Sequence, residues 1–170
     1  MPRSAPSSST TGRCRILRAS IVDDIRGGPV GDPFELPHGF DNARDALGAR
    51  FTDQRSEIDR VIGAMERVVD GVGEITRTGA ESSIAGLWQG AMKIRSLSAH
   101  WRASVDDMLT REFGHNEGLY LALAGNLGYY ADDPAKLWWL FFAVAQGGYL
   151  ASGGTFIKGG SRTLTMRLAR

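Results

Sequence analysis

A double glycine near the end of the chain joins a short stretch typical of a strand to a segment typical of a helix. Residues 154–158 carry β-branched and aromatic side chains, which suit a pleated surface. Glycine permits backbone angles and close approaches that a Cβ atom forbids, and a serine before a helix is a good N-cap. Because the start of a helix also attracts anionic or planar ligands, we single out four consecutive residues as a candidate ligand-contact site: Lys158, Gly159, Gly160 and Ser161.

The two polar residues of this candidate site also have ordinary structural interpretations. Lys158 suits a solvent-facing strand end, and Ser161 suits a plain helix cap. The sequence contains no G-x-G-x-x-G fingerprint between a strand and a helix, no P-loop and no Gly-x-Ser-x-Gly elbow. His38, His100 and His115 are too scattered for metal-ligand spacing. Catalytic residues therefore stay unassigned, and we expect no metal site.

A second candidate set lies in an uninterrupted apolar run over residues 137–145. Asp133-Pro134 predicts the start of its helix and Gly147-Gly148 the end. The run is shorter than the roughly 20 apolar residues that span a membrane. A helix that is apolar on all sides is either buried in the core or faces an apolar ligand. In the second case aromatic side chains line a tunnel or mouth for a long apolar substrate: Trp138, Trp139, Phe141, Phe142 and Tyr149.

Two further helices are expected to position these candidates. Thr52 is the expected N-cap of the longest helix, in which Ile58, Met65 and Val72 repeat every seven residues. This repeat predicts either packing within the domain or the seam of a dimer. Ser104 is spaced as the N-cap of a second helix that ends near Gly114.

Residues 116–130 can form another helix, since its leucines recur every four residues at Leu119, Leu123 and Leu127. The strand over residues 154–158 has no obvious partner elsewhere in the sequence. An unpaired strand edge is costly when buried and prone to association when exposed. We therefore expect a mainly helical α+β fold with one or two short strands near the C-terminus.

Length and composition set wider limits on the chain. Its 170 residues and 42% hydrophobic content suit a single domain with a real core. The formal net charge of +1 gives no long-range field that would attract nucleic acid. Cys14 is the only cysteine, so an internal disulfide is excluded and a cytoplasmic location is the default.

The first part of the sequence differs from the rest. Residues 1–22 contain four arginines and no acidic residue, a composition typical of either a disordered tail or an organelle-targeting segment. Residues 27–33 are dense in glycine and proline, as a loop is. We therefore expect a disordered or linker segment over residues 1–31 and a domain over residues 32–170.

The stretch over residues 158–161, followed by a helix with two leucines, resembles the substrate-domain segment of flavoprotein oxidoreductases of the phytoene desaturase type. This group includes carotenoid isomerases and retinol saturases. Residues 34–40 and the helix start at 104–109 also resemble segments of that group. Residues 51–54 depart from it, because the group often has Phe-Pro-Glu-Glu where this chain has Phe-Thr-Asp-Gln.

The resemblance implies an FAD-dependent, amine-oxidase-like enzyme that desaturates, saturates or isomerises a long apolar substrate such as a carotenoid by flavin hydride chemistry. It also implies that Gly159 and Gly160 bring main chain close to the substrate or the flavin edge, with Lys158 and Ser161 as polar neighbours. The chain then corresponds to part of the substrate (cap) domain of a Rossmann-type flavoprotein.

Because a dinucleotide fingerprint is missing, we expect a fragment that is inactive and does not bind FAD alone. The alternative is a non-catalytic helical module that binds a partner helix or an apolar ligand. Peripheral contact with a membrane is a further option, and the sequence leaves the oligomeric state open.

Overall fold

The computed structural model describes residues 16–18, 21–77, 102–130 and 133–169, and this part of the chain is mainly helical, as the sequence predicts. The chain divides into a larger unit over residues 19–154 and a smaller unit formed by residues 1–18 and 155–170. The larger unit contains, in chain order, β2 (Ile21–Ile25), η1 (Gly28–Val30), β3 (Phe34–Pro37), α1 (Phe40–Arg50), η2 (Thr52–Gln54), α2 (Arg55–Arg77), α4 (Val105–Phe113), α5 (Glu117–Ala124), η3 (Gly125–Tyr129) and α6 (Trp139–Ser152).

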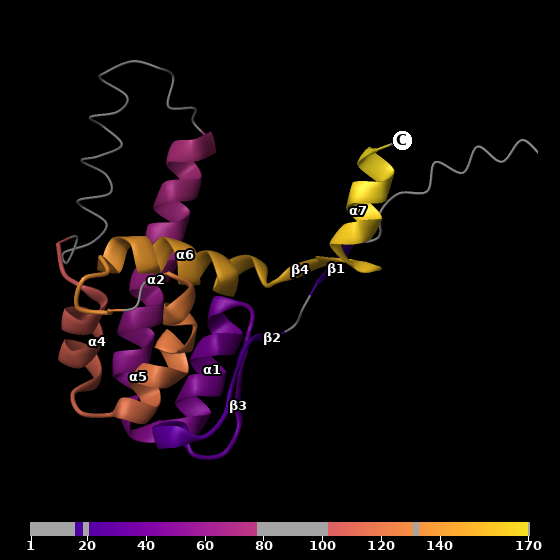
Figure 1. The fold of residues 1–170 in the computed structure, drawn as a ribbon. Helices are drawn as coiled ribbons and strands as arrows, with labels where there is room; N and C mark the ends of the chain where they lie inside the picture. The colour runs from indigo at the N-terminus through magenta and orange to yellow at the C-terminus, as the bar shows by residue number, and fades with distance from the viewer. Residues whose placement is uncertain (1–15, 19–20, 78–101, 131–132, 170) are drawn as a thin grey trace, which may run out of the picture. The chain divides into compact units, whose positions relative to one another are not determined.

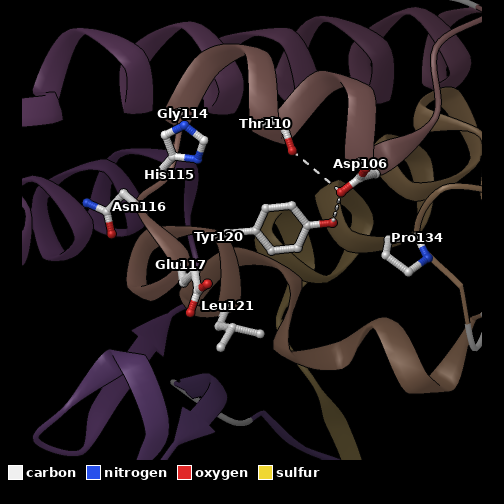
Figure 2. Close-up of a pocket in the computed structure, with 9 residues that line it drawn as sticks. All are labelled: Asp106, Thr110, Gly114, His115, Asn116, Glu117, Tyr120, Leu121 and Pro134. Carbon is white, nitrogen blue, oxygen red and sulfur yellow. Dashed lines mark hydrogen bonds between the residues drawn. The ribbon is translucent and has the colours of Figure 1, made fainter.

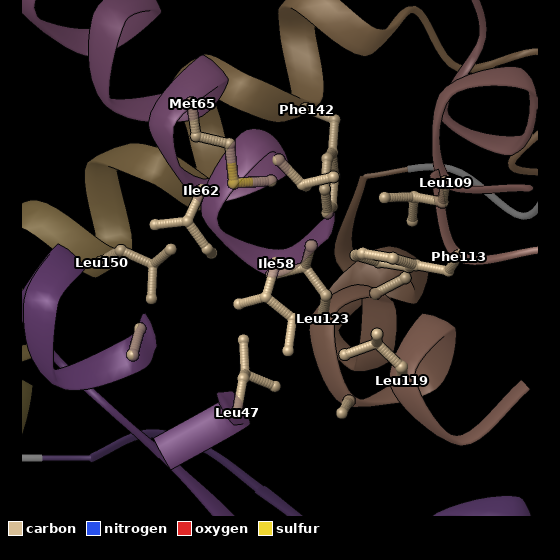
Figure 3. Close-up of a cluster of buried hydrophobic side chains, with 14 of the residues drawn as sticks. Leu47, Ile58, Ile62, Met65, Leu109, Phe113, Leu119, Leu123, Phe142 and Leu150 are labelled. Carbon is tan, nitrogen blue, oxygen red and sulfur yellow. The ribbon is translucent and has the colours of Figure 1, made fainter. Parts of the chain in front are cut away.

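The core of the larger unit lies around α2, which packs against α1, α4 and α6 (Figure 1). Ile58, Ile62 and Met65 of α2 are fully buried and point into a cluster with side chains from α4, α5 and α6 (Figure 3). The cluster also holds Leu47, Leu109, Phe113, Leu119, Leu123, Phe142 and Leu150. The seven-residue repeat of α2 is therefore used inside the unit: Ile58 and Met65 are buried and Val72 is half-buried.

Helix α4 begins and ends where the sequence predicts. The Ser104 hydroxyl accepts a hydrogen bond from the Asp107 backbone N–H at 3.0 Å, and the Asp107 carboxylate accepts one from the Ser104 N–H at 3.1 Å. This reciprocal pair satisfies two N–H groups that a helix start leaves without partners. Gly114, at φ 62°, ends the helix.

The other predicted helix limits need correction. Thr52 does not cap α2: it begins the short 3-10 turn η2, and α2 starts at Arg55. The helix predicted over residues 116–130 is α-helical only to Ala124, after which η3 continues as a 3-10 helix.

The start of α6 is also displaced from its predicted place at Asp133-Pro134. The Asp133 carboxylate caps a turn, accepting from the Ala135 N–H at 3.0 Å. Trp138 is extended, because the segment before α6 pairs with the segment before α4: the Val105 N–H donates to Leu137 O and the Trp139 N–H to Ala103 O, both at 2.9 Å. Because these hydrogen bonds join two distant segments and keep Trp138 extended, α6 begins only at Trp139.

The predicted break at Gly147-Gly148 is wrong, since α6 continues to Ser152. The reason is the packing of α6 on α2. A Cβ atom at buried Gly147 would lie 2.7 Å from Val69 Cγ2, so the missing side chain lets the two helices approach closely. At this position glycine serves helix contact and does not end the helix.

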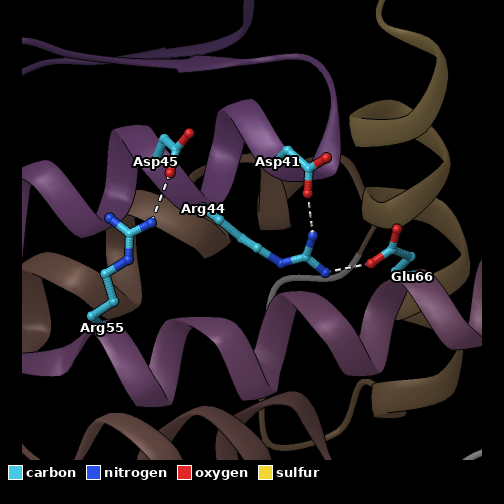
Figure 4. A network of polar contacts seen from close by, with 5 residues as sticks. All are labelled: Asp41, Arg44, Asp45, Arg55 and Glu66. Atoms are coloured by element: carbon cyan, nitrogen blue, oxygen red, sulfur yellow. Dashed lines mark hydrogen bonds and ion pairs between the residues drawn. The ribbon is translucent and has the colours of Figure 1, made fainter.

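Ion pairs hold α1 to the start and the middle of α2 (Figure 4). Arg44 of α1 donates to Asp41 at 2.7 Å and to Glu66 of α2. Partial burial opposes the charge of Arg44, but the hydrogen bonds and charges of Glu66 and Asp41 raise its pKa. Arg55 pairs with Asp45 at 2.7 Å, with both side chains largely exposed.

Strands occupy two stretches of the segment expected to be disordered or a linker. In the larger unit, β2 pairs antiparallel with β3, with Asp24 opposite Glu35 and Ile25 opposite Phe34. Phe34 and Leu36 of β3 are buried, which attaches this sheet to the core. Residues 1–15 and 19–20 of that segment lie outside the described residues.

The smaller unit contains β1 (Ile16–Arg18), β4 (Thr155–Ile157) and α7 (Gly160–Leu168). The strand expected to lack a partner has one: β4 pairs antiparallel with β1, with Ile16 opposite Ile157 and Arg18 opposite Thr155. The residues of one strand do not indicate a partner strand that is distant in the sequence. The expectation that the strand over residues 154–158 lacks a partner was therefore wrong.

Candidate functional site

The double glycine forms an exposed turn between β4 and α7 in the smaller unit. Gly159 has φ 90° and ψ 9°, and Gly160 has φ 76°, both in the region that favours glycine. A Cβ atom at Gly159 would lie 2.5 Å from Thr163 Oγ1, which donates to Gly159 O at 2.8 Å. Side-chain-bearing residues would therefore strain this turn at both positions.

Ser161 lies inside α7, since Gly159 occupies the N-cap position without a side-chain cap. The expectation that Ser161 caps the helix is corrected accordingly. Lys158, Gly159, Gly160 and Ser161 are all exposed. The turn thus presents main chain, one cation and one hydroxyl to the surroundings, which suits contact with a ligand or a neighbouring chain segment.

The five aromatic residues proposed to line a substrate path are divided between two sides of α6. Trp139 and Phe142 are buried in the core, with ring centroids 6.0 Å apart. Trp138, Phe141 and Tyr149 are exposed by 65%, 55% and 48%. We call these three residues the α6 aromatic face. α6 contains no charged residue, and its exposed side is therefore uniformly apolar or neutral.

A recess of about 510 Å³ lies where α4 and α5 meet (Figure 2). Asp106 and Thr110 of α4 form one wall, and Tyr120 and Leu121 of α5 form another. The remaining wall residues come from the α4–α5 connection, the start of α5 and the segment before α6: Gly114, His115, Asn116, Glu117 and Pro134.

The hydroxyl of Tyr120 donates to Asp106 Oδ1 across the recess at 3.2 Å (Figure 2). Burial, followed by the charge of Asp106 and this hydrogen bond, raises the pKa of Tyr120 to about 12. Two carboxylates and a neutral phenol line the recess, so it can accept hydrogen bonds or a cation. The sequence gives no sign of the contact between Asp106 and Tyr120, because nothing local joins residues on two helices.

Asn116 is occupied by structural contacts at the edge of this recess. Its Oδ1 accepts from the Leu119 N–H at 3.0 Å and so caps α5. Its Nδ2 donates to Gln54 Oε1 at 2.6 Å, while Gln54 Nε2 donates to Phe113 O at 3.0 Å. The amides thus hold η2 to the α4–α5 connection.

Within the described ranges, no three histidine, cysteine, aspartate or glutamate side chains gather closely enough to bind a metal ion. Among the helices described, none is both long and apolar enough to pass through a bilayer.

Comparison of the chain with protein-family models, curated proteins and solved structures found no match.

Proposed function

We propose that this chain is part of an FAD-dependent oxidoreductase of the phytoene desaturase type, in which its helices cover a long apolar substrate. The α6 aromatic face carries the proposal. Phe141 and Tyr149 are exposed on a helix without a charged residue, and the exposed ring of Trp138 immediately precedes that helix. Exposed apolar surface of this kind marks contact with an apolar ligand, a membrane or another protein surface. A long apolar substrate would cover this surface through apolar contacts alone.

Of the five aromatic residues in the second candidate set, only the exposed three can touch such a substrate. Trp139 and Phe142 support the face from behind, because they anchor α6 in the core. In the proposed enzyme, a bound flavin would supply the hydride chemistry for desaturation, saturation or isomerisation. The sequence has no dinucleotide fingerprint, and we therefore propose that this chain does not bind FAD alone.

The turn over Lys158–Ser161 supports the same proposal through its main chain. Its left-handed glycines leave the backbone open to a flat or bulky group. Lys158 and Ser161 then serve as exposed polar neighbours of the substrate or flavin.

The alternative is a non-catalytic helical module that binds an apolar ligand on the α6 aromatic face. A partner helix seated on the seven-residue repeat of α2 is not supported, since Ile58 and Met65 are buried within the larger unit.

Binding of diphenylhexatriene, a rod-shaped hydrocarbon polyene that fluoresces in apolar surroundings, tests whether the face binds apolar ligands. We expect saturable binding by the purified chain. Phe141→Ala should weaken it by about tenfold or more, because burying a large apolar side chain contributes roughly 1.5–3 kcal/mol. Phe156→Ala, which removes an exposed aromatic ring from the smaller unit, is the matched control and should leave the affinity unchanged. Equal affinities of the wild type and Phe141→Ala for diphenylhexatriene would show that the α6 aromatic face does not bind the apolar ligand.

The coding DNA on both sides of this reading frame separates the enzyme from the module. A segment encoding G-x-G-x-x-G upstream, together with further flavin-domain sequence downstream, is expected for the enzyme. Unrelated genes on both sides would leave the ligand-binding module as the better interpretation.

A further inference from the structure

Gln146 lies on the inner side of α6 and is fully buried. Within the described residues, its Nε2 has no hydrogen-bond partner. A buried donor without a partner has lost its hydrogen bond to water and gained none in exchange, which destabilises the folded chain. The amide lies on the helix that carries the α6 aromatic face, where any apolar residue of similar size would be more stable in the free protein. A polar group kept at such a cost is expected to serve contact with something else.

Two polar side chains of the segment that follows α5 approach the same amide. Asn126 Nδ2 lies 3.4 Å and Tyr130 Oη 3.5 Å from Gln146 Oε1. Both distances are at the long end of the range for hydrogen bonds. Both residues are only half-buried, whereas Gln146 is fully enclosed. The amide oxygen is therefore weakly held, and a ligand reaches the amide only when these two side chains move aside.

Tyr130 connects this amide to the α6 aromatic face. Its ring packs edge-on against Phe141 at a centroid distance of 6.3 Å and against Phe142 at 6.2 Å. Phe141 is exposed and Phe142 is buried. The Tyr130 ring therefore lies beside an exposed ring of the face while its hydroxyl is directed to Gln146. A ligand on Phe141 that displaces this ring meets the amide next.

We infer that Gln146 binds an oxygen atom at one end of the apolar ligand, donating a hydrogen bond from Nε2, with Asn126 and Tyr130 completing the polar end of the site. The inference rests on the proposed function and narrows its substrate class to long apolar molecules with an uncharged oxygen, such as an alcohol, an aldehyde or a ketone. A pure hydrocarbon leaves the Nε2 donor unpaired. A carboxylate brings a charge to three neutral side chains that cannot compensate it. A site built to bond a ligand oxygen discriminates strongly against the analogue that lacks it.

Displacement of bound diphenylhexatriene by 1-dodecanol and by dodecane tests the assignment. For each protein, the affinity for 1-dodecanol is divided by the affinity for dodecane. Comparing this ratio between the wild type and Gln146→Leu cancels the different solubilities of the two compounds. We expect the preference for the alcohol to fall about tenfold in Gln146→Leu, since the variant cannot donate a hydrogen bond to the ligand oxygen in the buried site. Gln146→Met should behave in the same way and serves if the leucine variant does not fold.

Tyr129→Phe is the matched control, because it removes a hydroxyl from a strongly exposed ring of η3 that belongs neither to the α6 aromatic face nor to the contacts of Gln146. Its preference for the alcohol should equal that of the wild type. An unchanged ratio in both Gln146 variants would overturn the assignment of Gln146 while leaving apolar binding intact. Absence of diphenylhexatriene binding by the wild type would overturn the proposed function and this inference together.

Discussion

At the scale of single residues, contacts between α4 and α5 set the properties of the recess. Tyr120 and Asp106 come from different helices and meet at 3.2 Å. The phenol donates a hydrogen bond to a carboxylate in a half-buried position, where a second negative charge would be unfavourable. The pair therefore keeps Tyr120 neutral and leaves Asp106 as the acceptor that a ligand would meet.

Alkaline titration tests this pair. Tyr120 has its pKa raised to about 12 in the folded chain, whereas a free tyrosine titrates near 10. A raised folded pKa contributes stability that is fully present below about pH 10 and is lost as the pH rises towards about 12. Tyrosinate absorbance should therefore show a late step among the four tyrosines, which Tyr120→Phe removes and Asp106→Asn moves to lower pH.

Tyr129→Phe is the control for this titration, since Tyr129 is strongly exposed and does not line the recess. The late step should persist in that variant. A late step that also persists in Tyr120→Phe would belong to another tyrosine, and would show that burial and Asp106 do not raise the pKa of Tyr120.

At the scale of elements, the approach of α6 to α2 depends on one glycine of a pair. Gly147 is buried against Val69, whereas a Cβ atom at Gly148 would have nothing within 4 Å. Two adjacent glycines in the same helix thus have opposite roles, the first in packing and the second only in lowering helix propensity.

Gly147→Ala and Gly148→Ala are a matched pair for thermal or denaturant unfolding. Gly147→Ala should lower the free energy of unfolding by about 1–3 kcal/mol, because overpacking forces α6 away from the stiff, β-branched Val69. Gly148→Ala should raise it by up to about 1 kcal/mol, since alanine is the better helix former. Stabilisation by both substitutions would mean that α6 and α2 are less closely packed than described.

At the scale of the whole molecule, the two units differ in how much apolar surface they bury. The larger unit holds the core cluster. In the smaller unit Phe156, Leu164 and Leu168 are all exposed. β4 has no buried side chain, and a two-stranded sheet is by itself only marginally stable in water. The smaller unit is therefore expected to open more readily than the larger one.

Hydrogen exchange on the intact chain measures this difference. Amides of β1, β4 and α7 should exchange faster than those of α2 and α6, because opening free energies follow local burial. The sheet of β2 and β3 is the internal control: it also has two strands, but Phe34 and Leu36 bury it against the core. Equal protection of both sheets would indicate that the smaller unit is held by contacts beyond its own residues.

The sequence by itself determined those features whose causes lie within one or two helical turns. It predicted α4 and its limits, because the Ser104–Asp107 capping box and Gly114 are local signals. It also predicted that the repeat of Ile58, Met65 and Val72 belongs to a long helix, because apolar periodicity shows directly in the residues. A mainly helical fold followed from such signals.

Tertiary structure alone decided which residues of α6 face the core. A helix that is apolar all round has no periodicity from which its inner side can be read, so contact with α2 separated Trp139 and Phe142 from Trp138, Phe141 and Tyr149. The pairing of β1 with β4, the Tyr120–Asp106 contact and the enclosure of Gln146 likewise join segments that are distant in the sequence. Such contacts depend on how elements pack together, which the residue types of any one segment do not encode.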